Sequence, residues 1–126
     1  MTEHAFAPEV LDRLRDEIEV RIETRAVADA KPHRAIIWIV VDDRDRVLVR
    51  SYRGASARWY REATSGTPAA LVVGREVIPV TVEHARDAGR IRACSVELER
   101  KYAGDPATPA MVSDAVLDTT LELHPA

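Results

Sequence analysis

The stretch AIIWIVVDDRDRVLVRSY, residues 35–52, decides the fold class of this chain. Its first seven residues are apolar and mostly β-branched, which is typical of a strand covered on both faces. The charged quartet at 42–45 predicts a turn, and the β-rich run from Val47 to Tyr52 predicts the returning strand. We therefore predict a β-hairpin over residues 35–52 whose first strand, 35–41, is buried on both sides.

The segments on either side of this hairpin predict further short strands and two or three helices. Apolar residues recur at helical spacing in some segments and at every second position in others. The hydroxyl of Ser56 suits the cap of a helix that follows the hairpin. About six strands joined by hairpins favour a mainly β fold with flanking helices, a small antiparallel barrel or sheet. The predicted helices cover residues 7–15, 57–63 and 83–102, and the other predicted strands cover 17–24, 70–73, 76–82 and 118–123.

The composition is that of a single globular domain over residues 1–126. Apolar residues make up 46% and charged residues 31%, which excludes a disordered or collagen-like chain. The net charge of -3 provides no global positive field, so we expect neither nucleic acid nor a membrane as a partner. The longest uncharged stretch, 63–74, is far shorter than the roughly 20 apolar residues of a membrane helix. The N-terminus lacks the pattern of a secretory signal, and we expect a cytoplasmic protein.

Cysteine and histidine give no indication of a reactive or metal centre. Cys94 is the only cysteine, which excludes an intramolecular disulfide and a cysteine-built zinc site. It lies on the apolar stripe of the predicted helix 83–102, so we expect a buried structural thiol. The four histidines have no ligand spacing, and we predict no metal site. Motifs of hydrolases and nucleoside triphosphatases are also missing from the sequence.

Positive charge is concentrated between residues 44 and 61. Six arginines and one aspartate give this segment a net charge of +5, while the rest of the chain carries -8. Such a local charge favours a small anion over a long polyanion, and arginine suits phosphate through its planar fork. Ordinary surface ion pairs and an arginine-rich genome are the alternative explanations. The six residues are Arg44, Arg46, Arg50, Arg53, Arg58 and Arg61.

Several of these runs resemble a bacterial family allied to the flavin-binding split-barrel proteins. The similar runs are IWIVVDDRDRVLVRSYRGASARWYREA (37–63), ALVVGREVIPVTVE (70–83), ERKYAG (99–104) and TTLELHPA (119–126). The related proteins include pyridoxamine-phosphate-oxidase-like enzymes and deazaflavin-dependent nitroreductases. The resemblance implies a six-stranded antiparallel split β-barrel, a homodimer and a flavin, FMN or a deazaflavin, at the dimer interface.

The resemblance also implies a position for the flavin site. In oxidase-like members, a Ser-x-Lys or Ser-x-Arg pattern between a strand and a helix holds the flavin phosphate, and Ser56-Ala57-Arg58 is similar to it. Arg34 is similar to a basic residue that flanks the flavin in some relatives. The chain lacks the Lys- and Gln-rich C-terminal motifs of the oxidases, which argues against pyridoxamine phosphate as substrate. The implied cofactor-binding residues are Arg50, Ser51, Tyr52, Arg53, Ser56 and Arg58.

These observations predict a flavin-binding redox protein that transfers a hydride to or from an unidentified small organic molecule. No catalytic side chain is identified, because the flavin ring itself performs hydride chemistry. The alternative is a non-enzymatic split-barrel module that binds another small anion or a protein partner. Aromatic residues that could line a ring pocket, unless they belong to the core, are Trp38, Tyr52, Trp59 and Tyr60.

Overall fold

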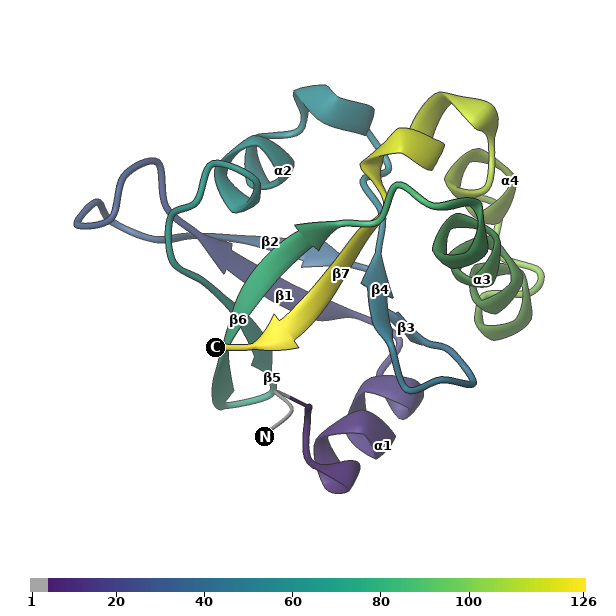
Figure 1. The fold of residues 1–126 in the computed structure, drawn as a ribbon, viewed down its shortest axis with the longest axis horizontal. Helices are drawn as coiled ribbons and strands as arrows, with labels where there is room; N and C mark the ends of the chain where they lie inside the picture. The colour runs from purple at the N-terminus through teal and green to yellow at the C-terminus, as the bar shows by residue number, and fades with distance from the viewer. Residues whose placement is uncertain (1–4) are drawn as a thin grey trace.

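The computed structural model describes residues 5–126 as a curved sheet of seven strands with helices at its ends and on its outer face (Figure 1). Short 3₁₀ segments lie at Gly54–Ser56 and Asp114–Thr119. The remaining elements are helices α1 (Pro8–Asp16), α2 (Arg58–Ala63), α3 (Ala88–Lys101) and α4 (Thr108–Met111), and strands β1 (Val20–Thr24), β2 (His33–Ile37), β3 (Val40–Val41), β4 (Val47–Val49), β5 (Ala69–Val73), β6 (Glu76–His84) and β7 (Leu121–Pro125).

All strand pairs in the sheet are antiparallel, and its two edge strands are consecutive in the sequence. The strand order is β2-β1-β5-β6-β7-β4-β3, so β2 and β3 are the two outermost strands. Only Trp38 and Ile39 separate these strands in the sequence, which draws the sheet into a curve. The fold is therefore mainly β with flanking helices, as the sequence pattern predicts, and is compatible with the split barrel that the resemblance implies. The number of strands is seven and not the six that were expected.

The prediction of one continuous strand over residues 35–41 is wrong, because β2 and β3 lie at opposite ends of the sheet. The backbone N–H of Ile39 donates to the Tyr102 hydroxyl at 3.2 Å, and Lys101 Nζ donates to the Ile39 carbonyl at 2.7 Å. Side chains at the end of α3 thus form the hydrogen bonds with the Ile39 backbone that a neighbouring strand would otherwise form. Only β3 and β4 form the hairpin, and Ile36 on β2 is 59% exposed.

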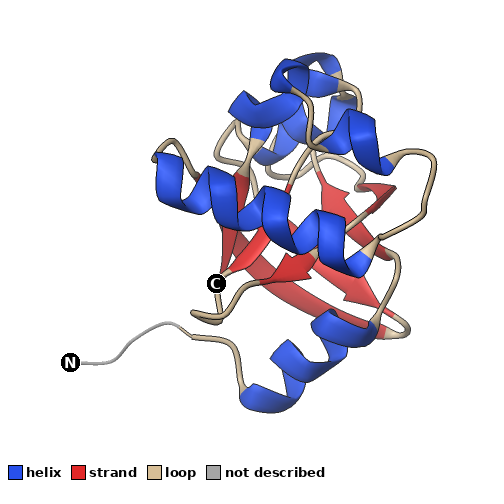
Figure 2. Ribbon diagram, turned by 90° about the vertical axis from the view of Figure 1, so that its right-hand side faces the viewer, coloured by secondary structure: helices blue, strands red, loops and turns tan. Residues whose placement is uncertain are grey.

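Two apolar cores hold the helices against the sheet. The first lies inside the curve, and helices α1 and α2, which contribute Leu14 and Tyr60 to it, lie at its opposite ends (Figure 1). The second lies between the outer face of β3–β4 and helix α3, which crosses in front of the strands in Figure 2. The buried residues of this second core are Val40, Leu48, Cys94, Leu98, Tyr102 and Met111.

Local predictions elsewhere agree with the structure, with shifted boundaries. The helix near the N-terminus, the strand that follows it and the β5–β6 hairpin are confirmed. The long helix begins only at Ala88, because Glu83 and His84 extend β6, and Asp87 caps the helix by accepting from the N–H of Arg90. The cap of α2 is Ala57 rather than Ser56. Within residues 5–126 no helix combines the length and apolarity needed to cross a bilayer.

Candidate functional site

An open cavity of about 380 Å³ lies between β2, the loop after β4 and the segment that contains α4. We call it the aromatic pocket, because Trp38, Tyr52 and Trp59 form much of its lining together with Ile36. Trp38 is held by stacking on Tyr102, with ring centroids 3.9 Å apart and planes inclined by 2°. A lining of this kind suits a flat, largely apolar ligand.

A second cavity of about 400 Å³ adjoins the first, and we call it the basic pocket. Among the described residues, its lining includes His33, Arg34 and Arg58 and no acidic side chain. The two pockets share Ala35 and Trp59 as lining residues, so they lie side by side. The first pocket thus offers apolar surface, and the second offers positively charged side chains.

A buried carboxylate positions the basic side chains of this second pocket. Glu62 accepts from Thr24 Oγ1 at 2.9 Å, from Arg58 Nε at 3.2 Å and from His33 Nδ1 at 3.4 Å. Burial alone would raise the pKa of Glu62, but the hydrogen bonds from Thr24, Arg58 and His33 outweigh it and lower the pKa. Arg58 Nη2 lies 2.7 Å from His33 Nε2, and since arginine only donates, Nε2 accepts and Nδ1 carries the proton.

The sequence analysis did not identify His33 or Glu62 as site residues. They are separated by 29 positions, and β2 and α2 bring them together. A lone histidine before a strand and a lone glutamate in a short helix carry no local pattern that would have revealed the pair.

The six residues implied as a flavin site lie in four different environments. Tyr52 and Arg53 line the aromatic pocket, and Arg58 lines the basic pocket. Tyr52 is 57% exposed, and within residues 5–126 the Arg53 side chain has neither a hydrogen bond nor an ion pair. These two side chains are therefore free to contact a ligand.

The two serines of the implied site line neither of the two pockets. Ser51 is buried, and its hydroxyl donates to the carbonyl of Gly54 at 2.7 Å. The Ser56 hydroxyl donates to the carbonyl of Arg53 at 3.2 Å. Both hydroxyls thus stabilise the turn between β4 and α2. Of the two polar residues of the Ser-x-Arg pattern, only Arg58 lines one of the two pockets.

Arg50 is 1% exposed and borders the aromatic pocket from the interior. Its guanidinium makes four hydrogen bonds of 2.8–3.0 Å and contacts no carboxylate within the described part of the chain. Burial lowers its pKa, yet an arginine remains charged at any ordinary pH. Arg50 therefore ties β4 to three other segments and leaves a fixed positive charge below the pocket. Its acceptors are Thr120 Oγ1, Ser95 Oγ and the carbonyls of Ile91 and Met111.

The arginines of residues 44–61 do not form one continuous anion site. Arg46 pairs with the buried Asp42 at 2.7 Å in the turn between β3 and β4. Arg61 donates to the backbone carbonyl of Ser56 at 3.2 Å. Only Arg53 and Arg58 of this segment have exposed side chains beside the two pockets.

Cys94 is completely buried in the core between α3 and the sheet. Burial raises the pKa of its thiol to about 11, so the reactive thiolate is scarce at neutral pH. The prediction of a buried structural thiol is confirmed.

The fold and the sequence of this chain are similar to those of known proteins. The fold is similar to HutZ, described as a heme storage protein from Vibrio cholerae, with a TM-score of 0.66, 10% identity, and coverage of 97% of this chain and 91% of that one. It is also similar to Rv2991, a conserved hypothetical protein from Mycobacterium tuberculosis, with a TM-score of 0.65, 14% identity, and coverage of 100% and 83%. None of the curated proteins compared with the chain matches it. A family model described as an uncharacterized protein conserved in bacteria (DUF2255) matches residues 10–123.

Proposed function

The chain belongs to the bacterial family DUF2255, and on that premise we propose that it binds a flavin, FMN or a deazaflavin, and transfers a hydride to or from a small organic molecule. The observation that carries this proposal is the shared wall of the aromatic and basic pockets, formed by Ala35 and Trp59. A flavin combines a flat apolar ring with a phosphorylated tail. Its two parts therefore match the two adjoining cavities.

The aromatic pocket suits the ring of such a cofactor. Trp38, Tyr52, Trp59 and Ile36 offer apolar and aromatic surface, and offset or edge contacts with a flat ring stabilise binding.

The basic pocket suits the phosphate. Arg34 pairs with Glu23 at 3.0 Å and Arg58 with Glu62 at 3.2 Å, and each pair leaves further guanidinium N–H donors for an anion. Arg53, at the aromatic pocket, is a third cation for the tail of the ligand. The paired carboxylates fix the positions of two of the three arginines before a ligand arrives.

When bound, the flavin supplies the hydride chemistry, and the protein binds, orients and polarises it. Arg50 contributes a permanent positive charge beneath the aromatic pocket, which favours negative charge that develops above it. The exposed hydroxyl of Tyr52 can donate a hydrogen bond to a ligand in the pocket. Trp38 and Trp59 exclude water from the ring.

We expect Arg58→Ala to weaken FMN binding about 10- to 150-fold, because it removes a charge-assisted hydrogen bond worth about 1.5–3 kcal/mol. The test is a fluorescence titration of FMN, a phosphorylated deazaflavin and riboflavin into wild type and variant. Riboflavin has the ring without the phosphate, so its affinity should change little. Arg75→Ala is the matched control, since this exposed arginine in the β5–β6 turn lines neither pocket.

Circular dichroism must show that Arg58→Ala remains folded, because Arg58 also binds Glu62. If wild type binds none of the three compounds at tens of micromolar, the flavin proposal is wrong. If wild type instead binds inorganic phosphate alone, the alternative of a non-enzymatic anion-binding module is favoured. Equal FMN affinity in wild type and Arg58→Ala would place the phosphate elsewhere.

We further propose that a second copy of the chain covers the open side of the aromatic pocket. Ile36 is 59% exposed on the edge strand β2, and Tyr52 beside it in the pocket lining is 57% exposed. Wild type should therefore sediment at twice the chain mass at micromolar concentration, and Ile36→Glu should sediment as a monomer. Val27→Glu is the control, since Val27 is 57% exposed but lines neither pocket. A monomeric wild type would contradict this proposal.

A further inference from the structure

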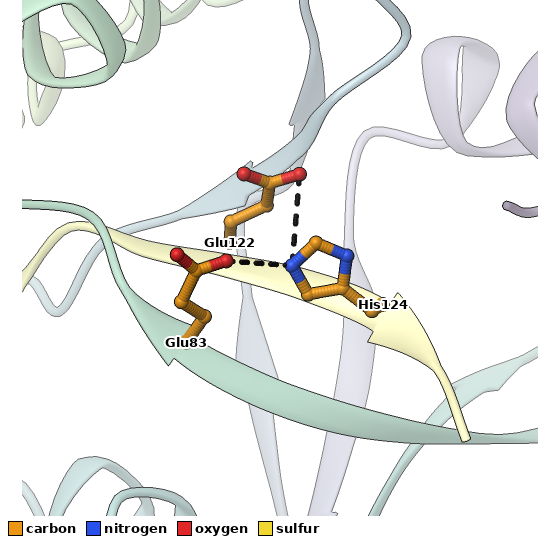
Figure 3. Close-up of side chains that lie close together, drawn as sticks. All are labelled: Glu83, Glu122 and His124. Carbon is orange, nitrogen blue, oxygen red and sulfur yellow. Dashed lines mark hydrogen bonds and ion pairs between the residues drawn. The ribbon is translucent and has the colours of Figure 1, made fainter. Parts of the chain in front are cut away.

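Three side chains with metal-binding atoms converge on the outer face of the sheet, away from both pockets (Figure 3). Glu122 and His124 are two residues apart on β7, so their side chains point to the same face. Glu83 of β6 stands directly opposite Glu122 in the strand register. Leu123, between the two β7 residues, faces the core, which fixes the register of the cluster.

The ligand atoms of the three residues lie close enough together to surround one ion. His124 Nε2 lies 2.8 Å from Glu83 Oε1 and 3.7 Å from Glu122 Oε2, and the ligand atoms of all three residues lie within 4.8 Å of one another. An ion held tetrahedrally about 2.0–2.2 Å from its nitrogen and oxygen ligands keeps those ligands about 3.3–3.6 Å apart. The two distances from His124 Nε2 differ from this range by about half an ångström or less, so side-chain adjustment would bring the imidazole and both carboxylates around one ion.

Arg90 holds the two carboxylates in this orientation. Its Nη1 lies 3.0 Å from Glu83 Oε2 and 2.9 Å from Glu122 Oε1, so the other oxygen of each carboxylate is left facing His124 (Figure 3). Arg90 is itself fixed by Asp87 at 2.6 Å. Groups that orient metal ligands through their second atoms raise affinity for the ion. Arg90 pairs with three carboxylates, those of Glu83, Asp87 and Glu122, so this group of four side chains carries excess negative charge that attracts a cation.

A separate cavity of about 440 Å³ gives access to this cluster. Glu122 and His124 form part of its lining, together with Arg15, Arg44 and Arg46. An ion on Glu122 and His124 would thus have a route to solvent and room for water or a small ligand at its remaining coordination positions.

We propose that Glu83, Glu122 and His124 bind one divalent first-row transition ion, of the Zn²⁺ type, at the β6–β7 surface. An imidazole nitrogen with two carboxylates favours such ions over Mg²⁺ and Ca²⁺, which prefer oxygen ligands alone. The site is independent of the flavin proposal, because none of its ligands lines the aromatic or the basic pocket.

The test uses the untagged full chain, freed of metal with a chelator. Calorimetry with Zn²⁺ and visible absorption with Co²⁺ should show saturable binding of one ion per chain, and Mg²⁺ and Ca²⁺ should not compete. His124→Gln and Glu83→Gln should each weaken binding by at least about 100-fold, the upper end of what the loss of an orienting group costs. These residues are at least partly exposed, so the variants should fold as wild type does.

Glu76→Gln is the matched control, since Glu76 is an exposed glutamate on the same strand whose ion pair is with Arg13 at 2.9 Å. Its affinity for Zn²⁺ should equal that of wild type. The proposal is overturned if wild type shows no saturable binding of Zn²⁺ or Co²⁺. It is also overturned if His124→Gln binds either ion as tightly as wild type, since the histidine would then only pair with Glu83.

Discussion

Arg50→Ala should lower the free energy of unfolding by about 3–5 kcal/mol, the largest effect that we expect from a single substitution in this chain. The guanidinium is 1% exposed and links β4 to α3, to α4 and to the threonine that precedes β7 through four hydrogen bonds. Its removal leaves buried acceptors without donors and a cavity that the surrounding side chains cannot fill. Each unpaired buried group costs about 1–3 kcal/mol.

Urea unfolding of wild type, Arg50→Ala and Arg50→Lys would measure this effect. Lysine keeps the charge but lacks the fork, so its variant should lie between the other two. Arg75→Ala should stay within about 0.5 kcal/mol of wild type, as a surface substitution does. If Arg50→Ala lowered the free energy of unfolding by less than about 1 kcal/mol, the structural role would be wrong. A ligand-binding role would then be favoured for Arg50.

Tyr102→Phe should lower the free energy of unfolding by about 2–3 kcal/mol, the second largest effect. The Tyr102 hydroxyl donates to the carbonyl of Ile18 at 2.6 Å and accepts from the N–H of Ile39 at 3.2 Å. Phenylalanine keeps the ring that stacks on Trp38 but leaves these two backbone groups without their partner. The amide of Ile39 should also exchange its hydrogen faster in the variant.

The pKa of the Tyr102 hydroxyl predicts how the difference in unfolding free energy between wild type and Tyr102→Phe depends on pH. Burial raises the pKa of Tyr102 to about 12, from an ordinary value of 10.0. The folded protein holds this proton more tightly than the unfolded chain does. The stabilisation that the neutral hydroxyl provides is therefore complete below about pH 10 and is lost as the pH rises through 12. Urea unfolding should therefore show the gap between wild type and Tyr102→Phe narrowing above pH 10. Tyr52→Phe, at a 57% exposed position, should change stability little. A pH-independent gap would contradict the assignment.

Local sequence pattern was sufficient to predict the elements whose partners are near in the chain. The β5–β6 hairpin follows from two β-rich runs around Gly74, whose φ of 61° suits a tight turn. Helix α1 follows from apolar spacing behind Pro8. Tyr52, Arg53 and Arg58 reach the two pockets because one short loop and the helix after it carry all three.

Long-range pairing decided what local pattern could not show. The apolar run at 35–41 became two strands because Lys101 and Tyr102, more than 60 residues later, bond the backbone of Ile39. Arg50, implied as a cofactor-binding residue, finds hydrogen-bond acceptors that are 41 to 70 residues away.

The sequence by itself determined the mainly β class, most of the elements and the loop that borders the proposed flavin site. It predicted no metal site, since its histidines are isolated along the chain, yet strand pairing sets His124 beside Glu83, 41 residues earlier. Periodicity reports only which face of an element is apolar. Which backbone groups find partners, and which polar side chains meet, depends on the order in which strands pair, and only the tertiary structure fixes that order.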